Sequence, residues 1–106
     1  MRIVWGNRKL LRLYHGSKGA PRLPGSVIAA FFDVVLSLRA ATDERRLYAA
    51  KGMHCEKLKG KRAARDEYSV RLNDQWRLVF TIEQDLVGKF LRIIELVDYH
   101  KGKRNV

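Results

Sequence analysis

The chain has 106 residues, enough for one hydrophobic core and too few for two domains of ordinary size. Hydrophobic residues make up 46% of it, which excludes a chain that is disordered throughout. Lys and Arg number 22 against 11 Asp and Glu, and a net charge of +11 on so small a protein favours a polyanionic partner such as nucleic acid. We expect one domain over residues 1–106.

The N-terminal part predicts a short strand and two helices. In "MRIVW", Ile3 and Trp5 share one face of a strand. Asn7 can then cap a helix, "RKLLRLYH", which Gly16 would end. A second helix is expected over residues 26–41. Apolar side chains occupy so much of its circumference that it needs cover on more than one side, from the sheet and from either the first helix or a partner protein.

Two polar features accompany these helices. Arg8, Arg12 and His15 lie on one side of the first helix, because they are spaced by four and then three residues. After the second helix comes the polar connection "ATDERRLYAAKG", which is expected to hold a further helical turn.

The next elements are two alternating strands, "DEYSVRL" and "WRLVFTI", which predict a hairpin. We expect residues 73–75 to form its loop, because that register sets Val70 opposite Leu78 on the apolar face. A slip of one residue would set apolar side chains against polar ones. The same register places Arg71 opposite Arg77 on the polar face.

The last strand, "KFLRIIELVDYH", is apolar on both faces, as in an interior strand, and Asp98, Tyr99 and His100 lie at its exposed end. His54 and Cys55 are expected in another short strand, where adjacent residues point to opposite faces and so cannot share a metal ion. Together these elements predict an α+β fold, with a mainly antiparallel sheet and two N-terminal helices packed on one face.

Several classes of site are disfavoured by the sequence. Gly16, Gly19 and Gly25 do not follow the strand–loop–helix pattern of a phosphate-binding loop. We expect no metal and no cofactor. Cys55, the single cysteine, cannot form an internal disulfide, is expected to be an inert and partly buried side chain, and suits a reducing cytoplasm. The N-terminus lacks the apolar core of a signal peptide, and no apolar run reaches the ~20 residues that span a bilayer. We therefore expect a cytoplasmic protein without membrane contact.

Basic residues are clustered in the C-terminal half. The run "EKLKGKRAAR" holds Lys57, Lys59, Lys61, Arg62 and Arg65 within nine positions. A run of this kind is usually a solvated loop. Here the run could form part of a trough that follows a phosphate backbone. The other cations of this trough would be Arg71 and Arg77 on the sheet and Lys101, Lys103 and Arg104 in the tail.

RNA can be cleaved without a metal by three kinds of side chain. A base must take the proton of the 2′-hydroxyl, a cation must hold the charge that grows on the phosphate, and an acid must protonate the departing 5′-oxygen. Histidine is suited to proton transfer, because its ordinary pKa is about 6.5. Arginine binds phosphate oxygens through two N–H groups, and tyrosine can stack on a base or donate a proton. The chain contains all three types.

The segments "MHCEKLKG", "YSVRLNDQWRLVF" and "VDYH", in this order, resemble the HigB toxins of bacterial toxin–antitoxin modules, within the RelE/ParE superfamily. The resemblance runs from about Leu47 to His100, and the N-terminal half matches in pattern only. It implies a RelE-like fold and a ribosome-dependent endonuclease. Such toxins cut mRNA in the vacant A site of the small ribosomal subunit and leave a 2′,3′-cyclic phosphate.

The resemblance also implies which residues form the catalytic site: His54, Lys57, Arg77, Asp98, Tyr99 and His100. One of the histidines would move the proton, Arg77 and Lys57 would hold the phosphate, and Tyr99 would stack on or orient the nucleotide. Asp98 would orient a histidine or stabilise its charged form. His54 and Lys57 are three apart, so one must lie beyond a strand end or at a bulge if both join the site.

The implied partners are the ribosome, mRNA and a HigA-like helix-turn-helix antitoxin, through which alone the chain would reach operator DNA. Two other functions remain open at this point. ParE-like proteins share the fold and inhibit DNA gyrase without cutting RNA, but they would not need His54, His100 or the Asp-Tyr-His ending. A non-catalytic RNA-binding module would explain the charge and leave that polar ending unexplained.

Overall fold

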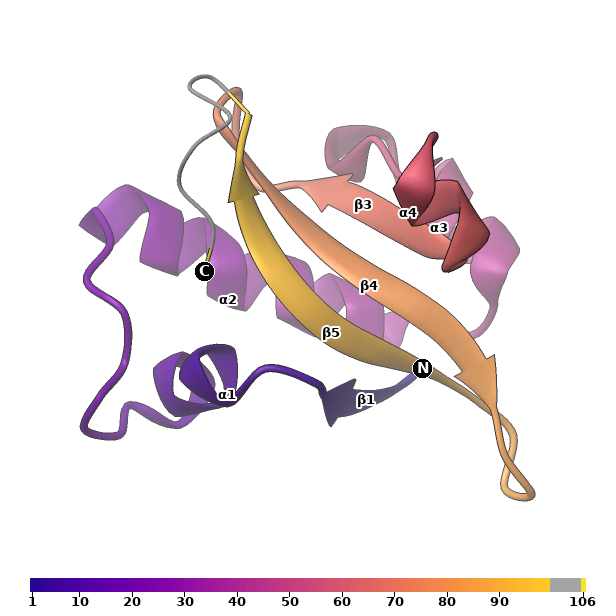
Figure 1. Ribbon diagram of the computed structural model, residues 1–106, viewed down its shortest axis with the longest axis horizontal. Helices are drawn as coiled ribbons and strands as arrows, with labels where there is room; N and C mark the ends of the chain where they lie inside the picture. Colours follow the sequence, from indigo (N-terminus) through magenta and orange to yellow (C-terminus); the bar gives the residue numbers. More distant parts are fainter. Residues whose placement is uncertain (100–105) are drawn as a thin grey trace.

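The computed structural model describes residues 1–99 and 106. Its elements are β1 (Arg2–Trp5), α1 (Arg8–His15), α2 (Gly25–Ala40), α3 (Glu44–Ala49), the 3₁₀ helix η1 (Lys51–Met53), β2 (Glu56–Lys57), α4 (Lys61–Ala64), β3 (Glu67–Arg71), β4 (Trp76–Gln84) and β5 (Lys89–Asp98). The strands form one sheet in the order β1-β5-β4-β3-β2 (Figure 1). Among the described strands only the β1–β5 pair is parallel, so the predicted α+β fold with a mainly antiparallel sheet is confirmed.

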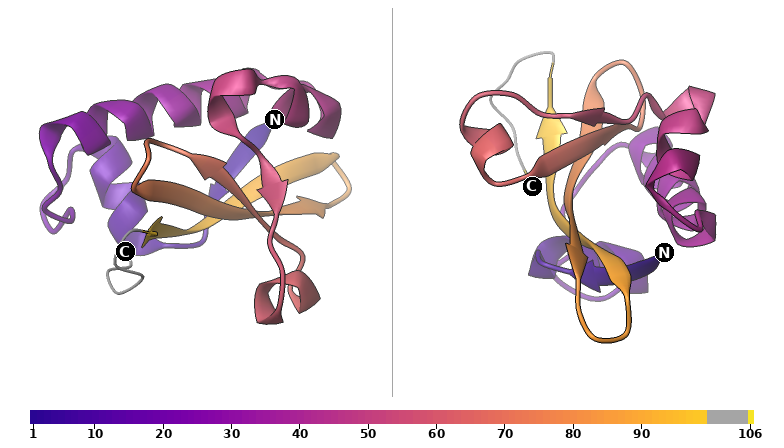
Figure 2. Two further views of the ribbon diagram at one scale, coloured as in Figure 1. Left: turned by 90° about the horizontal axis from the view of Figure 1, so that it is seen from above. Right: turned by 90° about the vertical axis from the view of Figure 1, so that its right-hand side faces the viewer.

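The main core lies between the sheet and the two N-terminal helices. Leu10 and Leu13 of α1 and Phe31 and Val35 of α2 are buried in one cluster with Leu78 and other side chains of β3, β4 and β5. Both helices therefore pack on the same face, as predicted. The views of Figure 2 show α2 and α3 on that side of the sheet and the short α4 on the other.

Local signals in the sequence place both ends of α1. The Asn7 side chain accepts a hydrogen bond from the Leu10 N–H at 3.1 Å, and Gly16 has a φ of 67°, a left-handed conformation that glycine adopts without strain. The helix runs over the residues predicted for it. The second helix begins and ends one residue earlier than predicted.

The β3–β4 hairpin has the predicted register. Val70 pairs with Leu78 and Arg71 with Arg77. The Asn73 side chain accepts hydrogen bonds from the backbone N–H groups of Gln75 and Trp76, at 2.9 and 2.7 Å, which stabilises the three-residue loop. Arg77 is thereby fixed on the face of the sheet opposite α1 and α2.

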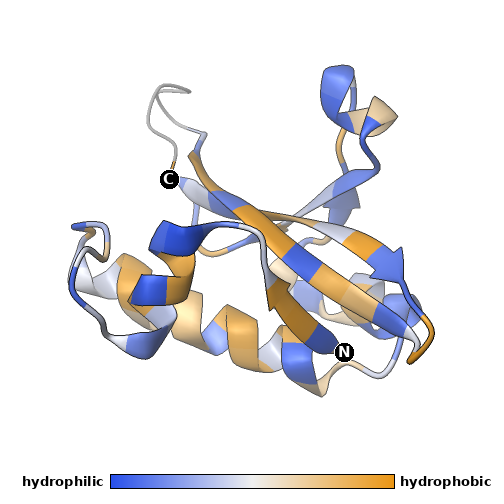
Figure 3. Cartoon of the chain, turned by 60° about the horizontal axis from the view of Figure 1, so that its bottom comes forward, coloured by the Kyte–Doolittle hydropathy of each residue, from blue (hydrophilic) through white to orange (hydrophobic). Residues whose placement is uncertain are grey.

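The interior position predicted for β5 is confirmed, since it lies between β1 and β4. Its charged residues alternate with pairs of apolar residues along the strand (Figure 3). A bulge between Val79 and Phe80 shifts the register against β4, so Ile94 has no partner there. On the face away from α2, Val79, Val97 and Leu58 form a second, smaller apolar cluster.

Three expectations need correction. His54 and Cys55 do not lie in a strand: η1 ends at Met53, His54 turns the chain, and β2 contains only two residues. The basic run is not wholly a loop, because residues 61–64 form α4. Asp98 is not exposed but 4% accessible, since its alternation along β5 places it beside Trp76 on the core face. None of the described helices is both long and apolar enough to cross a membrane.

Candidate functional site

Arg77 is the centre of the candidate site. Its side chain is only 12% exposed and lies on the face of the sheet that α1 and α2 leave open. Its Nε donates to Ser69 Oγ at 2.8 Å, and its Nη2 donates to the backbone carbonyl of His54 at 2.5 Å. Glu56 Oε1 lies 3.8 Å from Nη2. These contacts fix the guanidinium in one orientation, so little conformational entropy remains to be lost when it binds a phosphate.

His54 reaches this site through an unusual backbone conformation. It follows η1 with a φ of 44° and a ψ of 54°, the left-handed region that few non-glycine residues occupy. The turn brings its carbonyl against Arg77, and its side chain is exposed. His54 therefore lies before β2 begins, which is one of the placements required if His54 and Lys57 were both to join the site.

Tyr99 lies on the same side of the sheet as Arg77. Its ring centroid is 5.7 Å from the Arg77 guanidinium carbon, within the range of a cation–π contact. The Tyr99 N–H donates to the carbonyl of Gln75 at 2.7 Å, which ties the end of β5 to the β3–β4 loop. The side chain is 46% exposed. It thus offers an accessible aromatic face beside a fixed cation, an arrangement suited to a stacked base and its phosphate.

Asp98 is adjacent to Tyr99 in sequence but lies on the opposite face. Its Oδ2 accepts a hydrogen bond from Gln75 Nε2 at 2.9 Å. The Gln75 backbone holds Tyr99 while the Gln75 side chain holds Asp98, so both residues are attached to one loop. Among described residues, the geometry therefore supports a positioning part for Asp98 rather than direct contact with RNA.

Lys57 is not brought beside Arg77 by the sheet. It pairs with Tyr68 across the β2–β3 ladder, and its Nζ lies 5.9 Å from the Tyr68 ring centroid. Glu56, its neighbour, occupies the Arg77 side of this short strand. Lys57 Nζ also forms an ion pair with Asp66 at 3.2 Å.

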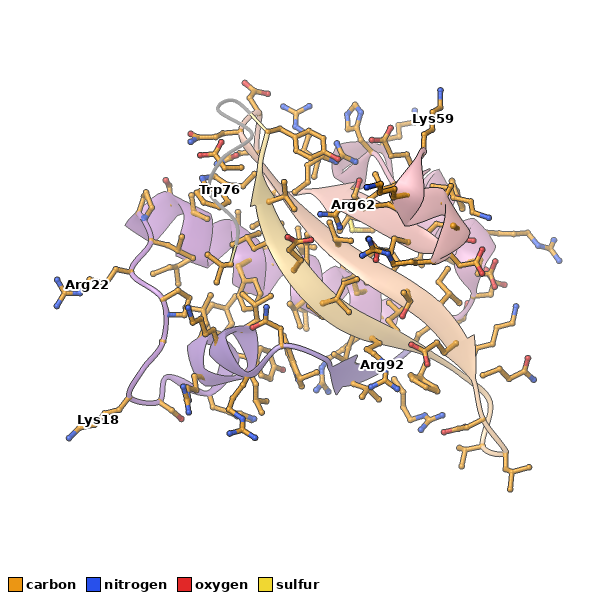
Figure 4. All side chains as sticks on the ribbon, viewed as in Figure 1. Lys18, Arg22, Lys59, Arg62, Trp76 and Arg92 are labelled. Atoms are coloured by element: carbon orange, nitrogen blue, oxygen red, sulfur yellow. The ribbon has the colours of Figure 1, made fainter. Side chains whose placement is uncertain are left out.

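Four of the seven described cations of the predicted basic trough have close acidic partners. Lys57 pairs with Asp66, Arg62 with Glu67 and Glu95, Arg65 with Glu67, and Arg71 with Asp74. Burial disfavours the charge on Arg62, but hydrogen bonds to Glu95 and Glu67 outweigh it and raise the pKa of Arg62. Figure 4 shows Lys59 pointing away from the sheet and Arg62 lying over it. Arg62 is therefore built into the fold more firmly than its place in a basic run suggests.

Two residues of the site were not found by sequence reasoning. Ser69 is completely buried and orients Arg77, and Glu56 lies within ion-pair distance of it. The signal for Ser69 was present: it follows Tyr68 in the strand, so it shares the polar face of Arg71 and Arg77. The nearness of Glu56 to Arg77 depends on the position of β2, which could not be located from the sequence.

The other reactive or metal-binding side chains near the site add little to its chemistry. Burial raises the pKa of the Cys55 thiol to about 11, although Arg77 nearby acts in the opposite direction. In the part of the chain that the structure describes, no three His, Cys, Asp or Glu side chains are grouped to hold a metal ion. His100, Lys101, Lys103 and Arg104, predicted as site or RNA-binding residues, lie outside the described residues.

Comparison with known proteins identifies a family for the chain and a solved structure with a similar fold. Residues 5–100 match the family model described as HigB-like toxin, a RelE-like toxin of type II toxin–antitoxin systems. The structure is similar to a YoeB/ParE toxin from Agrobacterium tumefaciens, with a TM-score of 0.61 and 19% sequence identity, over 93% of this chain and 99% of that one. At that identity the likeness shows a shared fold. No curated protein matches the chain.

Proposed function

The chain belongs to the HigB-like family of RelE-like type II toxins, and from this membership we propose that it is a ribosome-dependent endoribonuclease that cuts mRNA in the A site. As a type II toxin it has a protein antitoxin as its partner. The observation that carries the nuclease proposal is the fixed Arg77 guanidinium beside the exposed Tyr99 ring, on the open face of the sheet.

In this proposal the 2′-oxygen attacks the adjacent phosphorus. A new bond forms between phosphorus and O2′, the bond between phosphorus and O5′ breaks, and the product is a 2′,3′-cyclic phosphate. The proton of the 2′-hydroxyl passes to a histidine, and a second proton is delivered to the 5′-oxygen. His54, exposed at the rim of the Arg77 site, and His100 are the candidates for these two transfers.

Arg77 would stabilise the charge that develops on the phosphate oxygens. Because Ser69 and the His54 carbonyl already hold Nε and Nη2, its orientation is set before RNA arrives. Tyr99 would stack on a base or donate its hydroxyl proton. Lys57 would bind phosphate only by leaving Asp66, since in the folded chain it lies on the other side of the ladder.

We propose a HigA-like helix-turn-helix protein as the antitoxin and an effect on operator DNA only through it. The described surface of α2 has apolar residues that a protein could cover: Phe32 is 40% exposed and Leu36 is 68% exposed. The first helix accounts for part of the apolar circumference noted in the sequence, because Tyr14 stacks on Phe32 with ring centroids 5.8 Å apart.

The test is single-turnover cleavage of mRNA on purified, programmed ribosomes, with mapping of 5′ ends and of the terminal phosphate. The intact chain should cut in the A-site codon and leave a cyclic phosphate. His100→Ala should cut far more slowly, by ~10²–10⁴-fold if this histidine is the general acid or base. Tyr99→Phe separates stacking, which it preserves, from proton donation, which it removes. Inhibition of gyrase supercoiling without RNA cleavage would overturn the proposal.

A further inference from the structure

The first 32 residues of the chain contain no Asp or Glu. Residues 1–32 include six Lys and Arg, at positions 2, 8, 9, 12, 18 and 22, and the first carboxylate is that of Asp33. This stretch supplies six of the eleven net positive charges. The proposed catalytic site uses none of them, so this charge needs an explanation of its own.

Apart from Arg2, these cations lie on α1 and in the segment that follows it. Arg8, Lys9 and His15 of α1 are exposed, as is Lys18 in the turn that follows, while Arg12 is partly exposed and lies against Gly19. Lys18 and Arg22 extend away from the body of the molecule in Figure 4, on the side of α1 that is distant from α4. Within the described residues, no acidic side chain forms an ion pair with Arg8, Lys9, Arg12 or Lys18.

The other basic region, around α4, differs in that three of its five cations are paired. Lys57, Arg62 and Arg65 have carboxylates within ion-pair distance, whereas Lys59 and Lys61 have none among the described residues. Arg2, at the start of the acid-free stretch, pairs with Asp85 at 2.6 Å. A paired cation must lose or share its partner before it can bind a phosphate, whereas the cations of α1 have no such cost.

The spacing on α1 suits an extended polyanion. Arg8, Arg12 and His15 lie on one side of the helix, and this row covers roughly 10 Å at 1.5 Å per residue. Duplex nucleic acid carries one negative charge per ~1.7 Å of axis, so several phosphates lie within that length. No large hydrophobic side chain is exposed among residues 8–19. A protein interface normally has an apolar centre, but a contact with a phosphate backbone needs none.

We propose that α1 and the turn after it, residues 8–18, form a second polyanion-binding surface that contacts the phosphate backbone of helical RNA. The surface lies beside β1, at one edge of the sheet, while Arg77 contacts β3 toward the other edge (Figure 1). It therefore binds a different segment of RNA from the one at Arg77. This inference rests on the proposed function: the segment bound at α1 is ribosomal RNA. Its contact with α1 orients the toxin while mRNA occupies the Arg77 site.

The experiment compares two triple variants that each remove three charges. The test variant is Arg8→Gln, Lys9→Gln, Lys18→Gln, all at exposed positions with glutamine in place of the cation. The control variant is Arg2→Gln, Lys89→Gln, Arg92→Gln, whose cations pair with Asp85, Glu44 and Glu83. Neither triple includes a residue of the proposed catalytic site. Circular dichroism checks that both retain the fold.

Binding is measured by filter retention of a 20-base-pair RNA duplex over a series of KCl concentrations. Each lost phosphate contact lowers the slope of log K against log [KCl] by about 0.9. We expect the slope to fall by about 2 to 3 for the test variant and to stay near the parental value for the control. Equal losses in both variants would mean that only net charge matters, and the proposal would be wrong.

A second probe separates RNA from an acidic protein. If the test variant loses affinity for poly-L-glutamate and keeps its affinity for the duplex, the surface binds acidic polypeptide and the proposal is overturned. Cleavage on programmed ribosomes is assayed independently. A chain that binds the duplex through α1 and leaves ribosome-bound mRNA intact retains this surface and refutes the nuclease function instead.

Discussion

The two faces of the sheet contrast most sharply where β5 ends. Asp98 and Tyr99 are neighbours in sequence, yet Asp98 lies beside Trp76 on the helix-covered face and Tyr99 beside Arg77 on the open one. One is 4% exposed and the other 46% exposed. Three polar residues in a row therefore do not form a catalytic group by adjacency. Their contributions depend on the face to which strand alternation assigns each of them.

The open face is itself divided. Near the β3–β4 loop it carries Arg77 with Tyr99, and nearer α4 it carries Arg62 between Glu67 and Glu95. The first arginine has an accessible aromatic neighbour and one exposed carboxylate, Glu56, at 3.8 Å, near the limit of ion-pair distance. The second is enclosed by two carboxylates. We expect the first to matter for activity and the second for stability.

The largest effect is expected from Arg77→Ala. Loss of a fixed cation that stabilises developing charge typically costs ~10²–10³-fold in rate, so single-turnover cleavage should fall by that order. Arg77→Lys keeps the charge but cannot reproduce the hydrogen bonds from Nε and Nη2 to Ser69 and His54, and should recover only part of the rate. Full activity of Arg77→Ala would contradict the assignment of Arg77 to activity and of Arg62 to stability.

Arg62→Ala tests the other half of the open face. It leaves Glu67, whose side chain is 4% exposed, without its closest cation. Breaking a buried pair costs about 3–5 kcal/mol, and partial exposure of Arg62 reduces this to roughly 2–3 kcal/mol of unfolding free energy. Urea denaturation measures the loss. Arg65→Ala, which removes a longer and more exposed pair to the same Glu67, should cost about 0–1 kcal/mol.

Asp98→Ala tests whether Asp98 and its neighbour Tyr99 have different roles. The substitution removes the acceptor of the Gln75 Nε2 hydrogen bond from a buried position, at a cost of about 1–3 kcal/mol of stability. Cleavage should fall less than in Arg77→Ala, because Asp98 acts through the loop that also holds Tyr99. Asp98→Asn, which keeps an acceptor, should restore most of the stability. A pure rate loss with unchanged stability would contradict the buried placement.

Alternation and capping signals made much of the fold predictable. The ends of α1 followed from Asn7 and Gly16, and the hairpin register followed from matching apolar faces. The same alternation located Arg77 on the polar face. These features depend on residues close in sequence, whose periodicity directly reflects the pleat or the helical turn.

The errors fall where contacts are distant in sequence. The two-residue β2 is too short to show a period, so the position of His54 depended on its carbonyl meeting Arg77, 23 residues away. The pairing of Arg62 with Glu95 likewise joins α4 to β5. Asp98 is buried because it lies on the side of β5 that faces the helices. The sequence could not show which side that is, because β5 is apolar on both faces.

The smallest effect is expected at Cys55, which is partly buried close to the Arg77 site. Burial raises its pKa from 9.0 to about 11, even though Arg77 acts to lower it. The thiol is therefore neutral at physiological pH, and iodoacetamide should react slowly at pH 8 and faster as the pH approaches 11. Because the folded-state pKa lies above the unfolded value, the contribution of the neutral thiol to stability is complete below about pH 9 and is lost as the pH rises toward 11. Urea midpoints at pH 7.5, 9 and 10, compared with those of Cys55→Ser, isolate this change from the titration of tyrosine and lysine. Alkylation at pH 7.5 as fast as that of a free thiol would show that Arg77, and not burial, controls Cys55.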